Sequence, residues 1–189
     1  RGALLQQLLA AARRDADAFG IGLLAVKDAP TLDQDWAHSC KAAGLHSMPS
    51  LPTGLLPLPY GSVDAYLGSL GKSTRKDLRR KLRAPGPRVE WRDNGDDVLP
   101  DIMRLYEATL ARADLQFERL PAGYFSQVLA QLEQRARCVL YWVDGQLVAF
   151  NLVLIDQHRL IDKFFAHDLA HSREHNLYFR SWLTNVNYC

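Results

Sequence analysis

The chain has few cysteines and no long apolar run, and both absences limit what it can be. The three cysteines stand far apart, at Cys40, Cys138 and Cys189. An odd count with wide gaps and no metal-like or redox spacing favours reduced thiols and a cytoplasmic protein. No apolar run reaches the roughly 18 residues that a membrane-spanning helix needs. We therefore expect no membrane span, and we see no pattern of a secretion signal.

An excess of charge of one sign is also lacking. The 23 Lys and Arg against 21 Asp and Glu leave a formal charge of +2, which does not by itself predict a nucleic-acid partner. Apolar residues make up 48% of the 189, enough for a buried core in one domain or in two small lobes. The chain begins with Arg1 and ends at Cys189 inside a helical pattern, which suggests a piece of a longer protein.

The last third of the chain predicts three consecutive strands followed by one amphipathic helix. The strands are expected at 137–143, 146–155 and 159–166. Asp144-Gly145 joins the first two, and this pair favours a hairpin because a type I′ turn needs positive φ at both central residues. A meander that leads into a helix start can build an acyl-transfer site, since the free N–H groups there receive a pyrophosphate or an oxyanion.

The patterns before this region complete an α/β layout. We expect a first helix that ends at Gly20, a buried strand at Ile21–Val26, a helix opened by a Thr31/Gln34 capping box, short helices from Ser62 and Ser73, a strand at Val89–Asp93, and helices around Ile102 and from Pro121. The fold class predicted is α/β (mixed α+β), with a central mixed sheet that contains an antiparallel meander and is flanked by helices.

From Val89 onward, the order β-α-α-β-β-β-α resembles the first half of a GNAT-type N-acyltransferase fold. Details resemble one bacterial branch, the Fem-like acyltransferases of peptidoglycan biosynthesis, in which two GNAT-like modules stand in tandem. The resemblance rests on a Tyr-Leu-x-x-Leu helix followed by a basic run, and on two later strings. These read Tyr66–Leu70 with Lys72–Arg83, Leu160–Phe165 and Asn176–Phe179.

The resemblance implies a domain plan. Residues 1–60 would be the C-terminal half of a first GNAT-like module, 61–87 a basic helical linker, and 88–189 the N-terminal half of a second module. The two halves are then expected to complement each other as a permuted module in one compact domain. The oligomeric state stays open.

The resemblance also bears on the acyl donor. A standard GNAT domain holds the pyrophosphate of coenzyme A on a Gln/Arg-x-x-Gly-x-Gly/Ala loop after its fourth strand. Here the last glycine is Gly145, and residues 166–171 contain none. Side chains in place of glycine hinder the close approach of the backbone to the pyrophosphate. Fem-like enzymes that use aminoacyl-tRNA do not need the loop, so acyl-CoA and tRNA both stay open as sources of the acyl group. No metal is expected.

Four residues near the end of the third strand are candidate catalytic groups. Asp162 interrupts an apolar strand, where a charge often has a shifted pKa, although an edge-strand ion pair is the alternative. His167 or Asp168 could serve as general base for an amine, or both could belong to a polar surface loop. The resemblance implies that Tyr178 donates to a leaving thiolate or alcohol; core packing is the alternative.

The helix around 72–83 is a candidate substrate-binding element. It carries seven basic residues in twelve, and Arg75 and Arg79 lie four apart, on one face. Together with Lys76, and with Lys163 on the third strand, these residues could bind the phosphates of a nucleotide-linked substrate or a tRNA. The alternative is a solvated helix that packs through Leu78 and Leu82.

One buried amide is predicted to be structural. Asn151 interrupts the apolar run from 147 to 155. A buried side-chain amide needs hydrogen-bond partners. We expect Asn151 to anchor a neighbouring strand, with contact to the acyl carbonyl as the alternative.

Two functions follow from these residues. The first is N-acyl transfer, with an acyl or aminoacyl group passing to the amine of a small-molecule or nucleotide-linked acceptor. The second is a non-catalytic GNAT-like binding module that grips an anionic partner through the basic helix. Stabilisation by acyl donors would favour the enzyme, and stabilisation by polyanions alone would favour the binding module.

Overall fold

The computed structural model describes residues 1–27, 29–30, 32–49, 53–114, 116 and 119–189. They form two compact units, Arg1–Leu56 and Pro57–Cys189. Each unit is described by itself. No described helix has both the length and the apolar character to cross a membrane.

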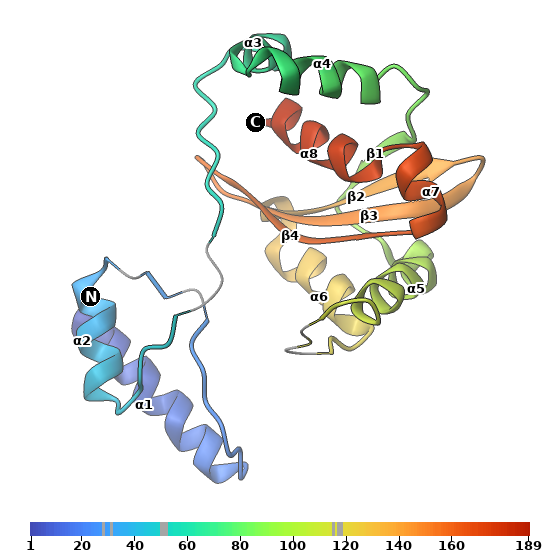
Figure 1. Cartoon of the computed structure of the whole chain (residues 1–189). Coiled ribbons are helices and arrows are strands. Elements are labelled where there is room, and N and C mark those ends of the chain that lie inside the picture. The colour runs from blue at the N-terminus through green and yellow to red at the C-terminus, as the bar shows by residue number, and fades with distance from the viewer. Residues whose placement is uncertain (28, 31, 50–52, 115, 117–118) are drawn as a thin grey trace. The chain divides into compact units, whose positions relative to one another are not determined.

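The first unit is a pair of helices, α1 (Gly2–Ala18) and α2 (Gln34–Ala42), which pack on each other (Figure 1). Leu9 and Ala16 are the buried apolar residues of α1. The Arg13 guanidinium donates to the carbonyl of Ala43 at 3.0 Å, which ties the two helices together. Helix α2 is capped by Asp33, whose carboxylate accepts from the amides at positions 35 and 36. The predicted cap at Thr31 lies outside the described residues.

The predicted strand at Ile21–Val26 is wrong. All six residues are described and none is in a strand. Ile21 is 55% exposed and Leu23 is 82% exposed. A short apolar run can form a stable strand only when a neighbouring strand pairs with it, and the described part of the first unit contains none. The assignment of residues 1–60 to a half-module stays a prediction.

The second unit is built on a four-stranded sheet. Its strands are β1 (Arg88–Arg92), β2 (Ala136–Val143), β3 (Gln146–Ile155) and β4 (Leu160–His167), in the order β1-β2-β3-β4. The predicted meander is confirmed, and Asp144 and Gly145 both have positive φ, at 48° and 79°. All three pairings are antiparallel, so the described sheet is not mixed, and β4 lies at its edge rather than in its middle.

Helices cover both faces of this sheet (Figure 1). On one face lie α5 (Leu99–Leu110) and α6 (Gly123–Leu132), each joined to the strands through a short 3₁₀ turn, η1 (Asp96–Val98) and η2 (Glu133–Arg135). On the other face lies α8 (Leu177–Tyr188), and α3 (Val63–Ser69) and α4 (Lys72–Lys81) pack on its outer side. The predicted fold class, a sheet with a meander flanked by helices, is confirmed.

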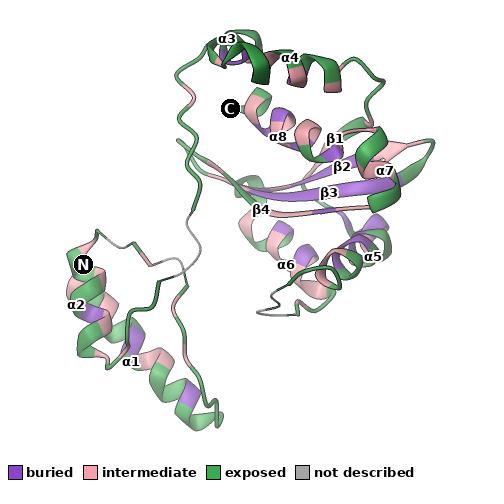
Figure 2. Cartoon of the chain, in the orientation of Figure 1, coloured by how far each residue is buried: buried purple, intermediate pink, exposed green. Residues whose placement is uncertain are grey.

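The core follows the alternation of the strands. Figure 2 shows burial concentrated along β2 and β3, which lie between the two helical layers. Phe125, Phe150 and Leu105 fill the α5/α6 side and are at most 2% exposed. Tyr141 and Leu177, both fully buried, belong to the α8 side. Both faces of β3 are therefore buried, which agrees with its nearly continuous apolar sequence.

The single helix predicted after β4 is in fact two. Helix α7 (Leu169–Glu174) ends at His175, and α8 begins after Asn176. Asn176 adopts the left-handed conformation with φ of 49°, which asparagine tolerates better than most residues. Its side-chain amide donates to the Lys81 carbonyl at 3.3 Å. Residues 169–188 contain no glycine or proline, so no helix-breaking residue in the sequence predicts this break.

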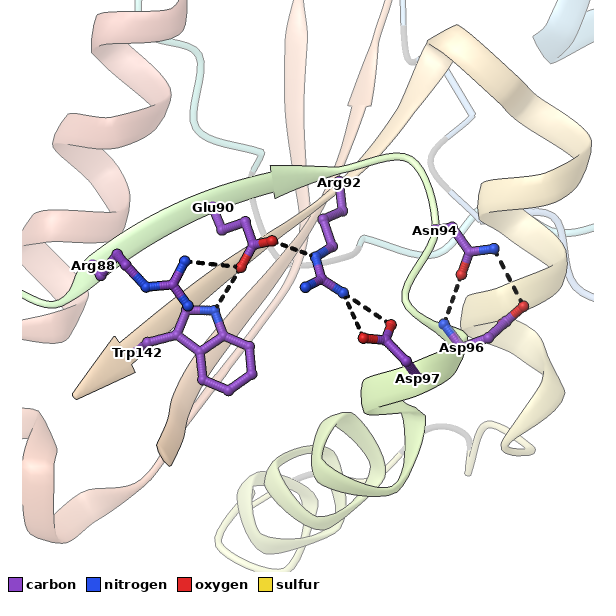
Figure 3. Close-up of polar contacts among 7 residues, drawn as sticks. All are labelled: Arg88, Glu90, Arg92, Asn94, Asp96, Asp97 and Trp142. Atoms are coloured by element: carbon purple, nitrogen blue, oxygen red, sulfur yellow. Dashed lines mark hydrogen bonds and ion pairs between the residues drawn. The ribbon is translucent and has the colours of Figure 1, made fainter. Parts of the chain in front are cut away.

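A charged network holds the edge strand β1 in place (Figure 3). The carboxylate of Glu90 accepts from Arg88 at 3.2 Å, Arg92 at 2.7 Å and the indole N–H of Trp142 at 3.1 Å. The Nη1 of Arg92 also donates to both carboxylate oxygens of Asp97, at 2.8 and 2.9 Å. The network therefore joins β1 to β2 and to η1. The Arg92 guanidinium is the main reason that the pKa of Glu90 and that of Asp97 are lowered.

Candidate functional site

His167 is the last residue of β4 and is half-buried. Its ring stacks on Phe165, with centroids 5.2 Å apart and planes inclined by 27°. Burial lowers the pKa of His167, and the positive charge of Arg112 lowers it further. The Nδ1 atom is buried and has no hydrogen-bond partner in the described part of the chain. The imidazole is therefore neutral at pH 7 and keeps a nitrogen that can accept a proton.

Asp168, the next residue, caps helix α7. Its carboxylate accepts from the amide of Ala170 at 2.7 Å and from that of His171 at 3.4 Å. The His171 Nδ1 lies 3.4 Å from the same oxygen. Burial acts to raise the pKa of Asp168, but these hydrogen bonds lower it overall. A carboxylate occupied in this way is a weak proton acceptor, so the structure gives Asp168 a capping role beside His167.

Tyr178 lies in the first turn of α8, close to the same ring system. It is 64% exposed, so it is not a core residue. Its ring meets Phe165 edge-on at a centroid distance of 6.3 Å. Phe165 thus contacts both His167 and Tyr178, and the sequence analysis did not identify it. We call His167, Asp168, Phe165 and Tyr178 the β4–α7 junction.

Asp162 lies in a separate polar cluster on the same face of the sheet. Its carboxylate accepts from the Asn151 amide at 2.6 Å and from the Asn185 amide at 3.2 Å. Asn185 also donates to the Asn151 side-chain oxygen at 3.0 Å, and Asn151 donates to the Phe164 carbonyl at 2.9 Å. Asn151 therefore anchors strand β4, as predicted. Although Asp162 is exposed as a residue on an edge strand, burial of its carboxyl raises its pKa, and the Asn151 bond offsets part of that shift.

The four predicted catalytic residues therefore form two groups along α8. Tyr178 lies beside Phe165, whereas Asn185 lies beside Asp162. Asn185 follows Tyr178 by seven positions along the helix, a rise of about 10 Å. One small substrate group cannot contact both ends at once. His167, Asp168 and Tyr178 come together, and Asp162 does not join them.

Lys163 occupies an irregularity in β4. Asp162 pairs with Val153 and Phe164 pairs with Leu152, so Lys163 is an extra residue between two successive partners. Such a bulge changes the direction of the neighbouring side chains. The Lys163 ammonium lies 5.5 Å from the centroid of the Phe164 ring, which belongs to the α5/α6 face. It points away from the β4–α7 junction, and among the described residues no carboxylate pairs with it, so the structure does not support the alternative of an edge-strand ion pair for Lys163.

The basic helix α4 uses part of its charge internally. Asp77 pairs with Arg80 and with Lys81, both at 2.7 Å. The Arg75 guanidinium donates to the Gly68 carbonyl at 2.7 Å. Lys76 and Arg79 are exposed, and no acidic side chain among the described residues pairs with either. These two remain available to bind an anion.

The C-terminal end of α4 lies against the start of α8. The Lys81 ammonium is 3.6 Å from the centroid of the Phe179 ring, a close cation–π contact. The Lys81 carbonyl accepts from Asn176, the residue that separates α7 from α8. The basic helix therefore ends near Tyr178, a proximity that the sequence alone could not give.

The residues at the start of α7 do not fit the pyrophosphate of an acyl-CoA. The first-turn amides that would receive it are already bonded to the Asp168 carboxylate. A second anion there would meet a negative charge at close range. As for metals, the described residues contain no group of three or more His, Cys, Asp or Glu side chains that could hold an ion.

Comparison with known families agrees with the topology. The model of the acetyltransferase (GNAT) domain matches residues 72–178, which is more than half of the chain and runs from α4 to the first turn of α8. The match includes β1, the helices α5 and α6, the whole meander and the β4–α7 junction. No curated protein matches the chain. The chain belongs to the GNAT acetyltransferase family.

Proposed function

We propose that this protein is an N-acyltransferase in which His167 is the general base for the attacking amine. The family provides the reaction class, transfer of an acyl group. The observation that carries the proposal is the state of His167, which has a lowered pKa and a buried Nδ1 without a partner among the described residues. A lowered pKa keeps the imidazole unprotonated at neutral pH, which is the state that a general base needs.

The proposed chemistry gives a task to three of the four residues of the junction. An amine attacks an acyl carbon only after losing a proton, and a neutral His167 accepts that proton. Tyr178 is exposed nearby and would donate a proton to the leaving group. Asp168 would keep the turn in place through its bonds to α7. β4 is one of the two edge strands of the described sheet, and its free N–H groups would stabilise the tetrahedral oxyanion.

The donor is proposed to carry phosphate groups that α4 binds. Lys76 and Arg79 are exposed and unpaired with acids among the described residues, and Arg75 lies on the same helix. The occupied amides of α7 argue against pyrophosphate binding at that turn. This pair of observations favours a Fem-like reaction that takes an aminoacyl group from tRNA over one that uses acyl-CoA. The acceptor would then be a small-molecule or nucleotide-linked amine in peptidoglycan biosynthesis.

A second function is favoured by α4 itself. The same exposed cations could hold an anionic partner without any chemistry at the β4–α7 junction. In that case the protein would be a binding module with a GNAT fold. Polyanions would then stabilise it against heat, and no product would form from any donor.

A transfer assay distinguishes the two functions. The protein is incubated with an aminoacyl-tRNA or with acetyl-CoA and a panel of primary amines, and amide products are measured by mass spectrometry. We expect product from at least one donor and a loss of about 100-fold or more in His167→Ala, the usual contribution of a general base. His158→Ala, at the exposed β3–β4 turn, is the matched control and should keep full activity.

Two outcomes contradict the proposal. If neither donor gives an amide product while polyanions raise the melting temperature, the binding module is the better description. If product forms at the same rate in the His167 and His158 variants, the base lies elsewhere.

A further inference from the structure

A cleft on the α8 side of the sheet lies apart from the β4–α7 junction. It has a volume of about 490 Å³ and lies between α8, strand β1 and the segment that joins α4 to β1. Val89, Trp91 and Leu183 contribute apolar walls. Trp91 stacks on Tyr188 with centroids 4.6 Å apart and planes inclined by 21°, so one wall is flat and aromatic. The volume lies within the range of small-molecule sites.

Arg180 is the cationic group of this cleft. Its Nε donates to the His175 carbonyl at 2.9 Å, and its Nη2 donates to the carbonyls of Leu82 and Ala84. No carboxylate lines the cleft, and no acidic side chain among the described residues pairs with Arg180. Burial lowers the pKa of Arg180, as expected for a guanidinium that has lost water without gaining a counter-ion. Its positive charge is therefore uncompensated.

Gly86 lets the guanidinium take this position. A Cβ at residue 86 would come within 2.7 Å of the Arg180 Cζ and would overlap Nη1. The Nη1 group makes no hydrogen bond with the described part of the chain, because the bonds of Arg180 are made by Nε and Nη2. Arg180 is thus held rigidly by three carbonyls, with one N–H pair unused.

We propose that the cleft binds a small organic carboxylate with a flat apolar body. The carboxylate is received by the guanidinium of Arg180, which lines the cleft, and the body lies against Trp91, Val89 and Leu183. A single guanidinium matches a single negative charge, whereas phosphate recognition usually draws on several cations. Planar groups favour stacking on an aromatic face such as that of Trp91. The Arg180 bond to His175 connects this cleft to the turn that precedes α8.

The test compares two probes of the same shape. Binding of benzoate and of the neutral benzamide to the full chain is measured by NMR titration, with the indole N–H of Trp91 as the reporter. We expect benzoate to shift this signal with an affinity at least tenfold higher than benzamide. Asn187→Asp adds a negative charge at the exposed rim of the cleft and should weaken benzoate binding about tenfold while benzamide binding stays unchanged. Gln131→Glu, on the exposed surface of α6, adds the same charge elsewhere and should leave both affinities unchanged.

A second variant tests the cation directly. Arg180→Met should abolish the preference for benzoate over benzamide, and circular dichroism establishes whether it folds. If Arg180→Met does not fold, the Asn187→Asp variant still tests the proposal. Three outcomes would each overturn the proposal. The first is equal affinity of the wild type for the two probes, and the second is an unshifted Trp91 signal up to about 10 mM benzoate, a concentration on the order of the Kd of the weakest specific sites. The third is that inorganic phosphate competes for the cleft as well as benzoate does.

Discussion

At the scale of single residues, the surroundings of each titratable group decide which of them can move a proton. His167 is neutral because burial and the charge of Arg112 both oppose protonation. Asp168 is ionised and occupied by backbone amides. Asp162 is held by two asparagine amides, and its pKa is raised. Three candidates that lie within seven residues of the sequence thus have three different surroundings: His167 is neutral and is the proposed base, Asp168 caps a helix, and Asp162 is held in a cluster of amides.

The raised pKa of Asp162 predicts how stability depends on pH. A carboxyl with a higher pKa in the folded state binds protons more tightly there, so its contribution to stability is present at acidic pH and is lost as the pH rises through that pKa. Wild type should therefore lose stability relative to Asp162→Asn as the pH rises from 4 to 7. Urea midpoints across this range measure the difference.

Asp156→Asn is a control with the opposite sign. The amide of His158 is the main cause that lowers the pKa of Asp156. Wild type should therefore gain stability relative to this variant as the pH rises. If both variants gave the same slope, the raised pKa of Asp162 would be refuted.

Asn151 should matter for stability more than its size suggests. Asn151→Ala removes the 2.6 Å bond to Asp162 and leaves the Asn185 amide with one partner fewer. Loss of a buried polar partner costs about 1–3 kcal/mol. Urea denaturation of this variant should show that decrease, whereas Gln131→Ala on the surface of α6 should stay within about 0.5 kcal/mol. An equally small effect for both would mean that water replaces the Asn151 amide.

At the scale of elements, the junction depends on how β4, α7 and α8 are connected. Asn176 separates the two helices in the left-handed conformation, and its side chain binds the end of α4. This residue fixes where α8 begins, and therefore where Tyr178 lies relative to Phe165. A continuous helix from Leu169 would direct the same side chains elsewhere.

The conformation of Asn176 can be tested with two substitutions. Both Asn176→Gly and Asn176→Val remove the bond to Lys81, but only valine resists a positive φ. The valine variant should be less stable than the glycine variant by about 1–2 kcal/mol. Thermal or urea unfolding measures this difference. Equal stability would indicate that φ is not positive at this position.

The basic helix gives a prediction about salt. Removing Lys76 and Arg79 together should weaken binding of a tRNA or another polyanion and flatten the dependence of affinity on salt, because fewer counterions are released. The melting temperature should barely change, since exposed charges contribute little to stability. The control removes Arg14 and Arg135 instead, two exposed arginines that lie far from α4 in the sequence. If the affinities of both double variants depended on salt in the same way, α4 would be a solvated helix without a role in binding.

Local sequence signals predicted the elements well and their connections poorly. Asp144-Gly145 determined the hairpin because its φ requirement is local. The extra residue Lys163 in β4 and the break at Asn176 depend on what packs against them, which no local pattern encodes. Asn151 was recognisable as an anchor because a polar residue in an apolar run must have partners. Arg112 and Phe165 were missed because neither type nor spacing marks them.

At the scale of the whole molecule, the chain has two compact units. The GNAT match begins at residue 72 and lies entirely within Pro57–Cys189. The predicted strand at Ile21–Val26 would have linked residues 1–60 to the sheet, and the structure has no strand there. Because that link is absent, the permuted plan, in which residues 1–60 complete the same domain, remains a proposal.

A truncated chain tests the domain plan. A fragment that starts at Pro57 contains the four described strands and the helices of the second unit that pack on them. We expect it to fold alone, with a single cooperative thermal transition within a few degrees of that of the full chain. An unfolded fragment would instead support the permuted plan, in which residues 1–60 complete the fold.

The central claim is that His167 accepts a proton during acyl transfer, and the pH dependence of the rate tests it most directly. The transfer rate is measured from pH 4 to 8 with an aromatic amine that stays uncharged over this range. A histidine with a lowered pKa predicts a rate that rises with pH through a midpoint below the ordinary value of about 6.5 and then levels off. The rise should vanish in His167→Ala and persist in His158→Ala. A rate that follows the same profile in all three proteins would contradict the account.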